Sequence, residues 1–298
     1  ISMSSVGRSG QSSRIRLLTA LEVQARLHQC PLIEVASLRR RERLVIPGAF
    51  RLDPCQLEGV ERYYPHYNKP EDARLQPPPQ LRKTLAQCGL QAHTPVILYG
   101  AGWAFPMGVA RVAWALLAAG MRDIAWLDGG LPAWLEAGLP LGPQRQPETV
   151  VDFGQLPDNW EEFIVTAPAG DSLLVDLRAH SEFCGERVDR YPFFRSRGHI
   201  PGALWGRNWT HLLEPGGHRL KSLETIRRDW ESLGIGPDRP LVFYCGTGWR
   251  SSLACSVAHL LNFSDVRNYD GGIYDWVSRG GVTVVPSTGA QMRPPKPL

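Results

Sequence analysis

The chain has 298 residues, of which 43% are hydrophobic and 21% are charged, and its formal net charge is +4. A chain of this length and apolar content suits two domains rather than one. Lysine and arginine residues are spread along the sequence, which argues against a dedicated nucleic-acid-binding protein, and no apolar run reaches the length of a membrane span.

The first half of the chain alternates short apolar runs with amphipathic stretches. Residues 1–16 are rich in Ser and Gly and are expected to form a disordered tail. The pattern that follows predicts helices at 20–28, 81–88 and 110–119, and strands at 32–35, 95–99 and 124–127. The strand candidates lack polar alternation, as expected of strands covered on both faces. We assign residues 17–141 to a first domain.

The second half repeats this alternation after a segment rich in Pro, Gln and Asp, residues 142–160, which we interpret as a linker. Strands are predicted at 173–177, 241–244 and 266–269, and helices at 223–233 and 251–261. We assign residues 161–285 to a second domain and the Pro-rich residues 286–298 to a disordered tail. Strands that alternate with helices predict an α/β fold, in which each domain is a parallel sheet flanked by helices.

Three sequence matches in the same order indicate that the two halves are copies of one unit. Val96-Ile97-Leu98-Tyr99-Gly100 corresponds to Leu241-Val242-Phe243-Tyr244-Cys245, and Leu127-Asp128-Gly129-Gly130 corresponds to Tyr269-Asp270-Gly271-Gly272. Ile46-Pro47-Gly48-Ala49 corresponds to Ile200-Pro201-Gly202-Ala203. The position that matches Cys245 is therefore Gly100, which has no side chain that could act as a nucleophile.

Cys245 stands where the predicted strand at 241–244 ends, and it opens the segment Cys245-Gly246-Thr247-Gly248-Trp249-Arg250. Ligands of parallel α/β folds bind at the carboxyl ends of the strands. Gly246 and Gly248 would let the loop curl so that backbone N–H groups point at the sulfur, and the N-terminus of the following helix adds partial positive charge. Both effects favour a thiolate. Cys245 is therefore the candidate catalytic nucleophile.

The rest of the loop supplies the candidate substrate-binding residues, which are Gly246, Thr247, Gly248, Trp249 and Arg250. A cation is disfavoured at a helix N-terminus, so Arg250 needs either an anionic substrate or an ion pair with a nearby Asp or Glu. Trp249 would either cover the sulfur or pack at an interface. Thr247 would either donate its hydroxyl to the sulfur or shape the turn.

These motifs, with Asp176-Leu177-Arg178 and Gly198-His199-Ile200-Pro201-Gly202-Ala203, resemble those of the tandem-domain rhodaneses, the thiosulfate and mercaptopyruvate sulfurtransferases. The loop and Leu204-Trp205-Gly206-Arg207 are most similar to the last two domains of bacterial sulfurtransferases with three rhodanese domains, so an upstream domain would be absent from this sequence. The resemblance implies a catalytic second domain and an inactive first domain. Trp103 and residues 63–68 of the first domain would either line an interdomain cleft or pack as surface loops.

The resemblance implies sulfur transfer in two steps. Cys245 would take the outer sulfur of thiosulfate as a persulfide, and cyanide, a thiol or an acceptor protein would then remove it. One position departs from the family pattern, because many members carry a substrate-binding Arg where this chain has Glu182, a carboxylate that we expect to repel an anionic substrate. The loop also ends Gly-Trp-Arg rather than Gly-Val-Thr, which favours thiosulfate over mercaptopyruvate.

Three other functions stay open. A 3-mercaptopyruvate sulfurtransferase would use the same cysteine, and a persulfide carrier or docking protein would receive sulfur from a partner with little turnover of small donors. A phosphatase of the same fold family would need five residues between its Cys and Arg, whereas four separate Cys245 from Arg250.

The six cysteines are Cys30, Cys55, Cys88, Cys184, Cys245 and Cys255. They show no zinc-binding spacing, so we expect neither a metal, nor a cofactor, nor a disulfide framework. Cys255 falls near the apolar face of its helix and is expected in the core. A reactive thiol favours the cytoplasm, although the periplasm stays open.

Overall fold

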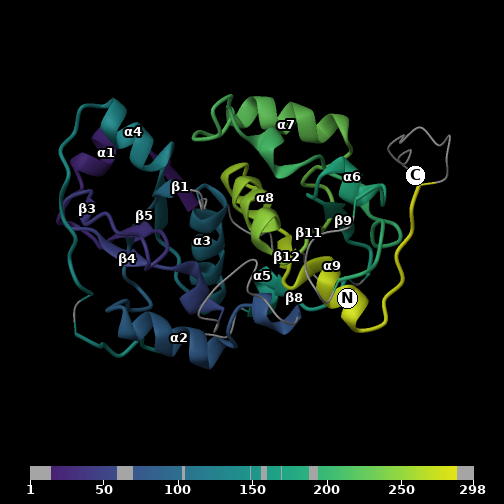
Figure 1. Ribbon diagram of the computed structural model, residues 1–298, viewed down its shortest axis with the longest axis horizontal. Coiled ribbons are helices and arrows are strands. Elements are labelled where there is room, and N and C mark those ends of the chain that lie inside the picture. Colours follow the sequence, from purple (N-terminus) through teal and green to yellow (C-terminus); the bar gives the residue numbers. More distant parts are fainter. Residues whose placement is uncertain are drawn as a thin grey trace, which may run out of the picture.

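The computed structural model describes residues 15–58, 70–102, 105–147, 149–155, 160–168, 170–187 and 194–286, which form two domains built around parallel sheets (Figure 1). The sheet of the first domain has the order β1-β6-β5-β2-β4. Its strands are β1 (Ile15–Leu18), β2 (Leu32–Val35), β4 (Phe50–Leu52), β5 (Val96–Gly100) and β6 (Ile124–Leu127). A small antiparallel sheet pairs β3 (Leu44–Val45) with β7 (Gly142–Pro143).

The sheet of the second domain has the order β10-β9-β11-β12-β8. Its strands are β8 (Ile164–Val165), β9 (Leu173–Asp176), β10 (Leu204–Trp205), β11 (Leu241–Tyr244) and β12 (Val266–Tyr269). Taken from the opposite edge, this order repeats that of the first sheet strand for strand. The shared topology agrees with the internal repeat and confirms the predicted α/β fold.

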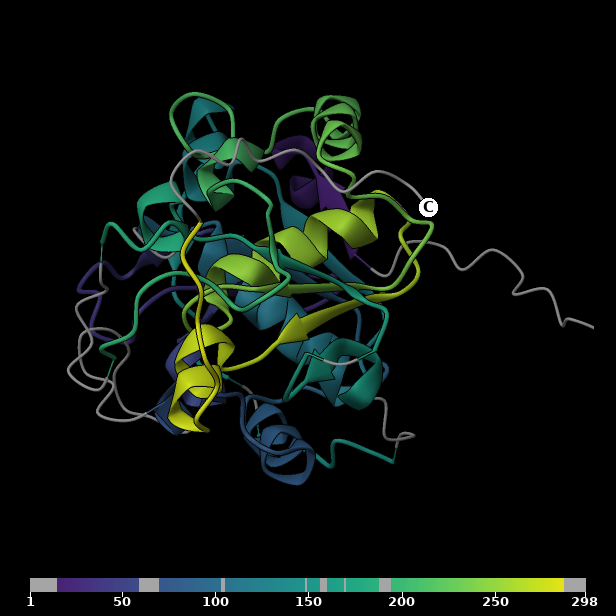
Figure 2. The same ribbon diagram turned by 90° about the vertical axis from the view of Figure 1, so that its right-hand side faces the viewer.

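Helices cover both faces of each sheet. In the first domain, α2 (Pro78–Gln87) and α3 (Met107–Ala119) pack on one face, and α1 (Ala20–Gln24) and α4 (Gly130–Glu136) on the other. In the second, α7 (Leu223–Ser232) and α8 (Trp249–Leu260) cover one face and α9 (Gly272–Ser278) the other, as Figure 2 shows. The shorter helices α5 (Trp160–Phe163) and α6 (His180–Phe183) complete the domain.

The two domains share one apolar core because α3 and α8 pack against each other between the sheets (Figure 1). Trp114 of α3 is fully buried, and its ring lies 5.5 Å from Phe163 and 5.0 Å from His259 of α8. Its indole N–H donates to the Phe163 carbonyl oxygen at 3.0 Å. A buried interface of this kind holds the two domains in a defined arrangement.

Several predicted boundaries were wrong. The predicted tail at 1–16 is too long, because Ile15 and Arg16 belong to β1 and pair with β6. The predicted linker at 142–160 includes β7 and the first residue of α5, and Phe153 accepts a backbone hydrogen bond from Ala92 of the first domain. Helix α1 ends at Gln24 instead of continuing to residue 28. The short edge strands and helices α4 and α9 were not predicted, because few residues carry their pattern.

None of the described helices has the length and apolar character that a membrane span requires.

Candidate active site

Cys245 follows the carboxyl end of β11, the central strand of the second sheet, and is 1% exposed. The two strands beside β11 are β9 and β12, so the cysteine lies at the middle of the sheet edge. Its carbonyl oxygen accepts a hydrogen bond from the N–H of Ile273, at the start of α9. The thiol therefore stands at the edge where parallel α/β folds bind their ligands.

The loop after Cys245 turns directly into helix α8. Gly246, Thr247 and Gly248 are all buried, and α8 begins at Trp249. Gly248 caps the helix with φ +84°, and a Cβ atom there would lie 2.9 Å from an oxygen of Asp270. A glycine is needed at this position both for its conformation and for the close approach. The first N–H groups of a helix have no partner within the helix, so they are available to an anion near the loop.

A buried network of hydrogen bonds connects the Cys245 loop to α8 and β12. Ser251 Oγ lies 3.5 Å from Cys245 Sγ and 2.6 Å from Asn268 Oδ1. The Asn268 amide donates to the Gly248 carbonyl at 3.0 Å and to Ser252 Oγ at 3.1 Å. The side chains are fully buried, so each polar group depends on these partners. Sequence analysis missed this role of Ser251 and Asn268. The signal available was the uncharged polar Asn268 within a predicted strand.

Arg250, a candidate substrate-binding residue, is paired with Glu182 of α6. Its NH1 and NH2 groups donate to the two carboxylate oxygens at 2.7 and 3.1 Å. Burial by itself raises the pKa of Glu182, but the Arg250 charge and the hydrogen bonds lower it to about 2. We expected Glu182 to repel an anionic substrate, but that expectation did not include Arg250, whose positive charge balances the carboxylate. Of the two alternatives for Arg250, the ion pair is the one present.

Trp249 packs at the domain interface. Its side chain is 8% exposed, and its indole N–H donates to Glu58 Oε1 of the first domain at 2.6 Å. The same oxygen accepts from Arg111 Nε of α3 at 2.9 Å, and Arg111 NH1 donates to Asp270 at 2.6 Å. Asp270 also accepts from the backbone N–H of Leu75. The first domain thus supports the loop through residues that sequence analysis did not single out.

The Asp176-x-Arg178 motif forms a buried ion pair. Arg178 donates from Nε and NH2 to the Asp176 carboxylate, at distances from 2.7 to 3.1 Å, and also to the Gly198 carbonyl. His199 stacks on Phe183 with ring centroids 3.8 Å apart, and Nδ1 lies 3.0 Å from the Phe183 carbonyl oxygen. Burial lowers the pKa of His199. These groups order the segment around Gly198 that borders α6.

The matching position in the first domain cannot hold a nucleophile. A Cβ atom on Gly100 would lie 2.1 Å from the Phe105 ring, so the space of a side chain there is already filled. Trp103 and residues 63–68, which we considered as a cleft wall, lie outside the described residues. Cys255 is fully buried in α8, as predicted, and burial together with the charge of Cys245 raises its pKa.

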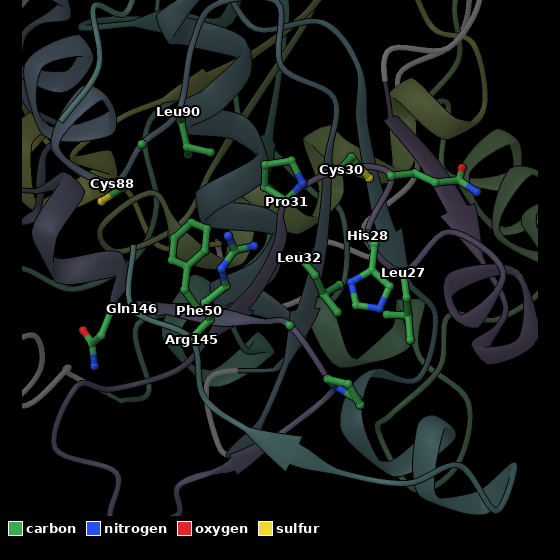
Figure 3. Close-up of a pocket in the computed structure, with 14 residues that line it drawn as sticks. Leu27, His28, Cys30, Pro31, Leu32, Phe50, Cys88, Leu90, Arg145 and Gln146 are labelled. Atoms are coloured by element: carbon green, nitrogen blue, oxygen red, sulfur yellow. The ribbon is translucent and has the colours of Figure 1, made fainter. Parts of the chain in front are cut away.

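A cavity of about 260 Å³ lies in the first domain, away from the Cys245 loop (Figure 3). Buried Leu32, Phe50 and Leu90 line it together with Cys30 and Cys88. Burial raises the pKa of both thiols. Among the described residues, no group of three or more His, Cys, Asp or Glu side chains is placed to hold a metal ion.

The family described as Rhodanese-like domain matches residues 19–137 and 161–279, which is most of the chain. The chain belongs to the rhodanese family. The matched segments contain every strand of the two five-stranded sheets except β1, which precedes the first segment, so this rhodanese is a tandem of two such domains. The predicted resemblance and the fold class are therefore confirmed.

Curated relatives carry the names of sulfurtransferases and of a sulfur carrier protein. Thiosulfate sulfurtransferase YnjE of Escherichia coli is 35% identical over 248 residues, which cover 78% of this chain and 54% of that protein. The chain therefore spans about half the length of this relative. Thiosulfate sulfurtransferase of Azotobacter vinelandii is 29% identical, and the match covers 86% of this chain and 91% of that protein. Sulfur carrier protein TtuD of Thermus thermophilus is 32% identical, and the match covers 69% of this chain and 75% of that protein. The 3-mercaptopyruvate sulfurtransferase of E. coli is 26% identical, and the match covers 81% of this chain and 83% of that protein.

Solved structures share the architecture. Wild-type EanB superposes with a TM-score of 0.78 at 29% identity, and the match covers 91% of this chain and 70% of EanB. YnjE superposes with a TM-score of 0.76 at 28% identity, covering 92% and 69%.

Proposed function

We propose that this rhodanese is a thiosulfate sulfurtransferase that carries sulfane sulfur as a persulfide on Cys245. The observation that carries the proposal is the position of Cys245, buried between the end of β11 and the N-terminus of α8. Relatives named thiosulfate sulfurtransferase support the choice of donor. A structure of EanB that holds a persulfide together with ergothioneine supports the chemistry.

In the first half-reaction, the Cys245 thiolate attacks the outer sulfur of thiosulfate. The S–S bond of thiosulfate breaks, and sulfite leaves with the electron pair. The N–H groups at the start of α8 are the donors that would stabilise the anionic sulfur. The Ser251 hydroxyl lies 3.5 Å from the sulfur and would join them by turning its one proton from Asn268 Oδ1 to the thiolate. The loop residues Gly246, Thr247 and Gly248 would contribute backbone N–H groups, while Trp249 anchors the loop to the first domain.

In the second half-reaction, a thiophile attacks the outer sulfur of the persulfide. Cyanide would yield thiocyanate, a thiol would yield a new persulfide, and Cys245 would return to the thiolate in either case. A protein thiol would be the physiological counterpart of these small acceptors. Two half-reactions through one covalent intermediate predict ping-pong kinetics.

Two alternative functions have specific support. Relatives named 3-mercaptopyruvate sulfurtransferase favour mercaptopyruvate as donor, and the relative named sulfur carrier protein favours a carrier that turns over small donors slowly. A comparison of kcat/KM for thiosulfate and mercaptopyruvate distinguishes the first alternative. A stable persulfide without appreciable thiocyanate formation would indicate the carrier.

The direct test is the intact mass of the protein after treatment with thiosulfate, for the wild type and for Cys245→Ala. We expect one added sulfur atom on the wild type and none on the variant. Cys255→Ala is the matched control, because it removes a cysteine from α8 and should keep the added sulfur. Equal sulfur uptake by Cys245→Ala and the wild type would refute the proposal.

A further inference from the structure

Arg250 is the only charged side chain in the loop from Cys245 to Arg250. Although burial lowers its pKa, the charges of Glu182 and Cys245 outweigh burial and raise the pKa of Arg250. Arg250 is the second residue of α8, directly after the loop that Cys245 opens, and a cation at this end of the helix would attract the anionic donor of the proposed reaction.

Glu182 holds this guanidinium from the neighbouring segment. The two hydrogen bonds, at 2.7 and 3.1 Å, have the bidentate geometry that makes Arg–carboxylate pairs strong. The carboxylate also accepts the backbone N–H of Ala179 at 2.9 Å, which fixes it at the start of α6. The Glu182 and Arg250 side chains are only 9% and 20% exposed, so solvent screens their charges weakly. The pair presents no net charge to a donor.

We propose that Glu182 is a specificity-determining residue which, by pairing with Arg250, lowers the preference of the site for thiosulfate over sulfur donors that carry one negative charge or none, without abolishing the use of thiosulfate. This inference rests on the proposed function. A dianion must either displace the Glu182 carboxylate from Arg250 or share the guanidinium with it. A donor with less charge gains less from Arg250, so it loses less when Glu182 occupies the guanidinium, because Coulomb energies scale with the charge of the donor.

Thiosulfate and methanethiosulfonate are two sulfur donors whose comparison isolates the effect of donor charge. The methanethiosulfonate ion has the sulfonyl framework of thiosulfate, with a methyl group in place of one charged oxygen. With either donor, the Cys245 thiolate attacks the terminal sulfur and the S–S bond breaks. Sulfite or methanesulfinate then leaves with the electron pair, and the same persulfide forms. The ratio of kcat/KM for thiosulfate to kcat/KM for methanethiosulfonate therefore reports mainly the response to donor charge.

The decisive experiment measures this ratio in the wild type and in Glu182→Gln. We expect the variant to raise the ratio about tenfold, mainly through a lower KM for thiosulfate, because one opposing charge is removed beside Arg250. Glu182→Asp retains the carboxylate and should keep the ratio within about twofold of the wild type. The double variant Glu182→Gln with Arg250→Gln should lose the increase, since it removes the cation that Glu182→Gln releases.

The ratio also separates this inference from its alternatives. Both donors are used by the same folded fraction, so a variant that merely unfolds more easily lowers both rates and leaves the ratio unchanged. A Glu182→Gln ratio within twofold of the wild type would refute the role of Glu182. Failure of the proposed function would look different, because neither donor would then add sulfur to wild-type Cys245.

Discussion

The indole N–H of Trp249 donates to Glu58 Oε1 at 2.6 Å, and this bond joins the first turn of α8 to the first domain. Glu58 also holds Arg111, which in turn holds Asp270 of the second domain. The first domain, which has Gly100 at the position that matches Cys245, thus supports the cysteine loop through a buried, charged network. This network gives the first domain a structural role at the Cys245 loop that does not depend on a cysteine at position 100.

Glu58→Gln should destabilise the protein by about 3–5 kcal/mol, because it leaves the buried Arg111 guanidinium without one of its two carboxylates. Urea denaturation at neutral pH measures the loss. The matched control is Glu136→Gln, whose pair with Arg219 also joins the two domains at 2.6 Å, but with side chains 62% and 45% exposed. The control should cost less than about 1 kcal/mol. Equal losses for the two variants would contradict the role of the buried network.

Ser251→Ala should slow persulfide formation about tenfold, because the Ser251 hydroxyl would turn from Asn268 Oδ1 to the thiolate during the reaction. A hydrogen bond to a charged group contributes about 1.5–3 kcal/mol, from which the lost bond to Asn268 is subtracted. Stopped-flow mixing with thiosulfate under single-turnover conditions measures this step. Ser256→Ala is the control, since Ser256 is also fully buried in α8 but donates to the Ser252 carbonyl instead of the sulfur. A similar slowing in both variants would mean that serine loss acts through the helix and that Ser251 has no contact of its own with the reacting sulfur.

Gly100→Cys in a Cys245→Ala background should not restore sulfur transfer. Phe105 fills the space at this position, so the added side chain should instead lower stability by about 1–3 kcal/mol through overpacking. Thiocyanate release and urea denaturation measure the two effects. The contrary outcome, a variant that gains sulfur on the introduced thiol with native stability, would show that the first domain keeps a usable site.

The free energy of unfolding should fall at acid pH because Glu182 takes up a proton there. Its pKa falls from 4.5 to about 2 on folding, so the unfolded chain binds more protons between these values. The stability that Glu182 contributes is complete above about pH 4.5 and is lost as the pH falls towards 2. The difference in unfolding free energy between the wild type and Glu182→Gln should therefore shrink from about pH 7 to about pH 3. A difference that stays constant over this range would contradict the charged pair.

Much of the fold could be predicted because it depends on local patterns. Apolar runs marked β2, β5, β6, β9, β11 and β12 to within a residue or so, and repeated motifs marked the two domains. The edge strands β4, β8 and β10 were missed because two or three residues carry too little periodicity, and β1 was missed because its first two residues were assigned to the N-terminal tail. For the site, the cysteine and its glycine loop were found from the strand, loop and helix pattern. The residues that bind the loop were not found, because they belong to helices and strands far from it in the sequence.

From the sequence alone it follows that a lone cysteine ends a strand and faces a helix N-terminus in one of two repeated units, because that arrangement depends on neighbouring residues. Only the tertiary structure decided what Arg250 and Trp249 do. Their partners Glu182 and Glu58 are 68 and 191 residues away in the chain, and the order of strands and the packing of α3 on α8 bring them together. Pairings at such separations depend on the folded geometry, which no local pattern specifies.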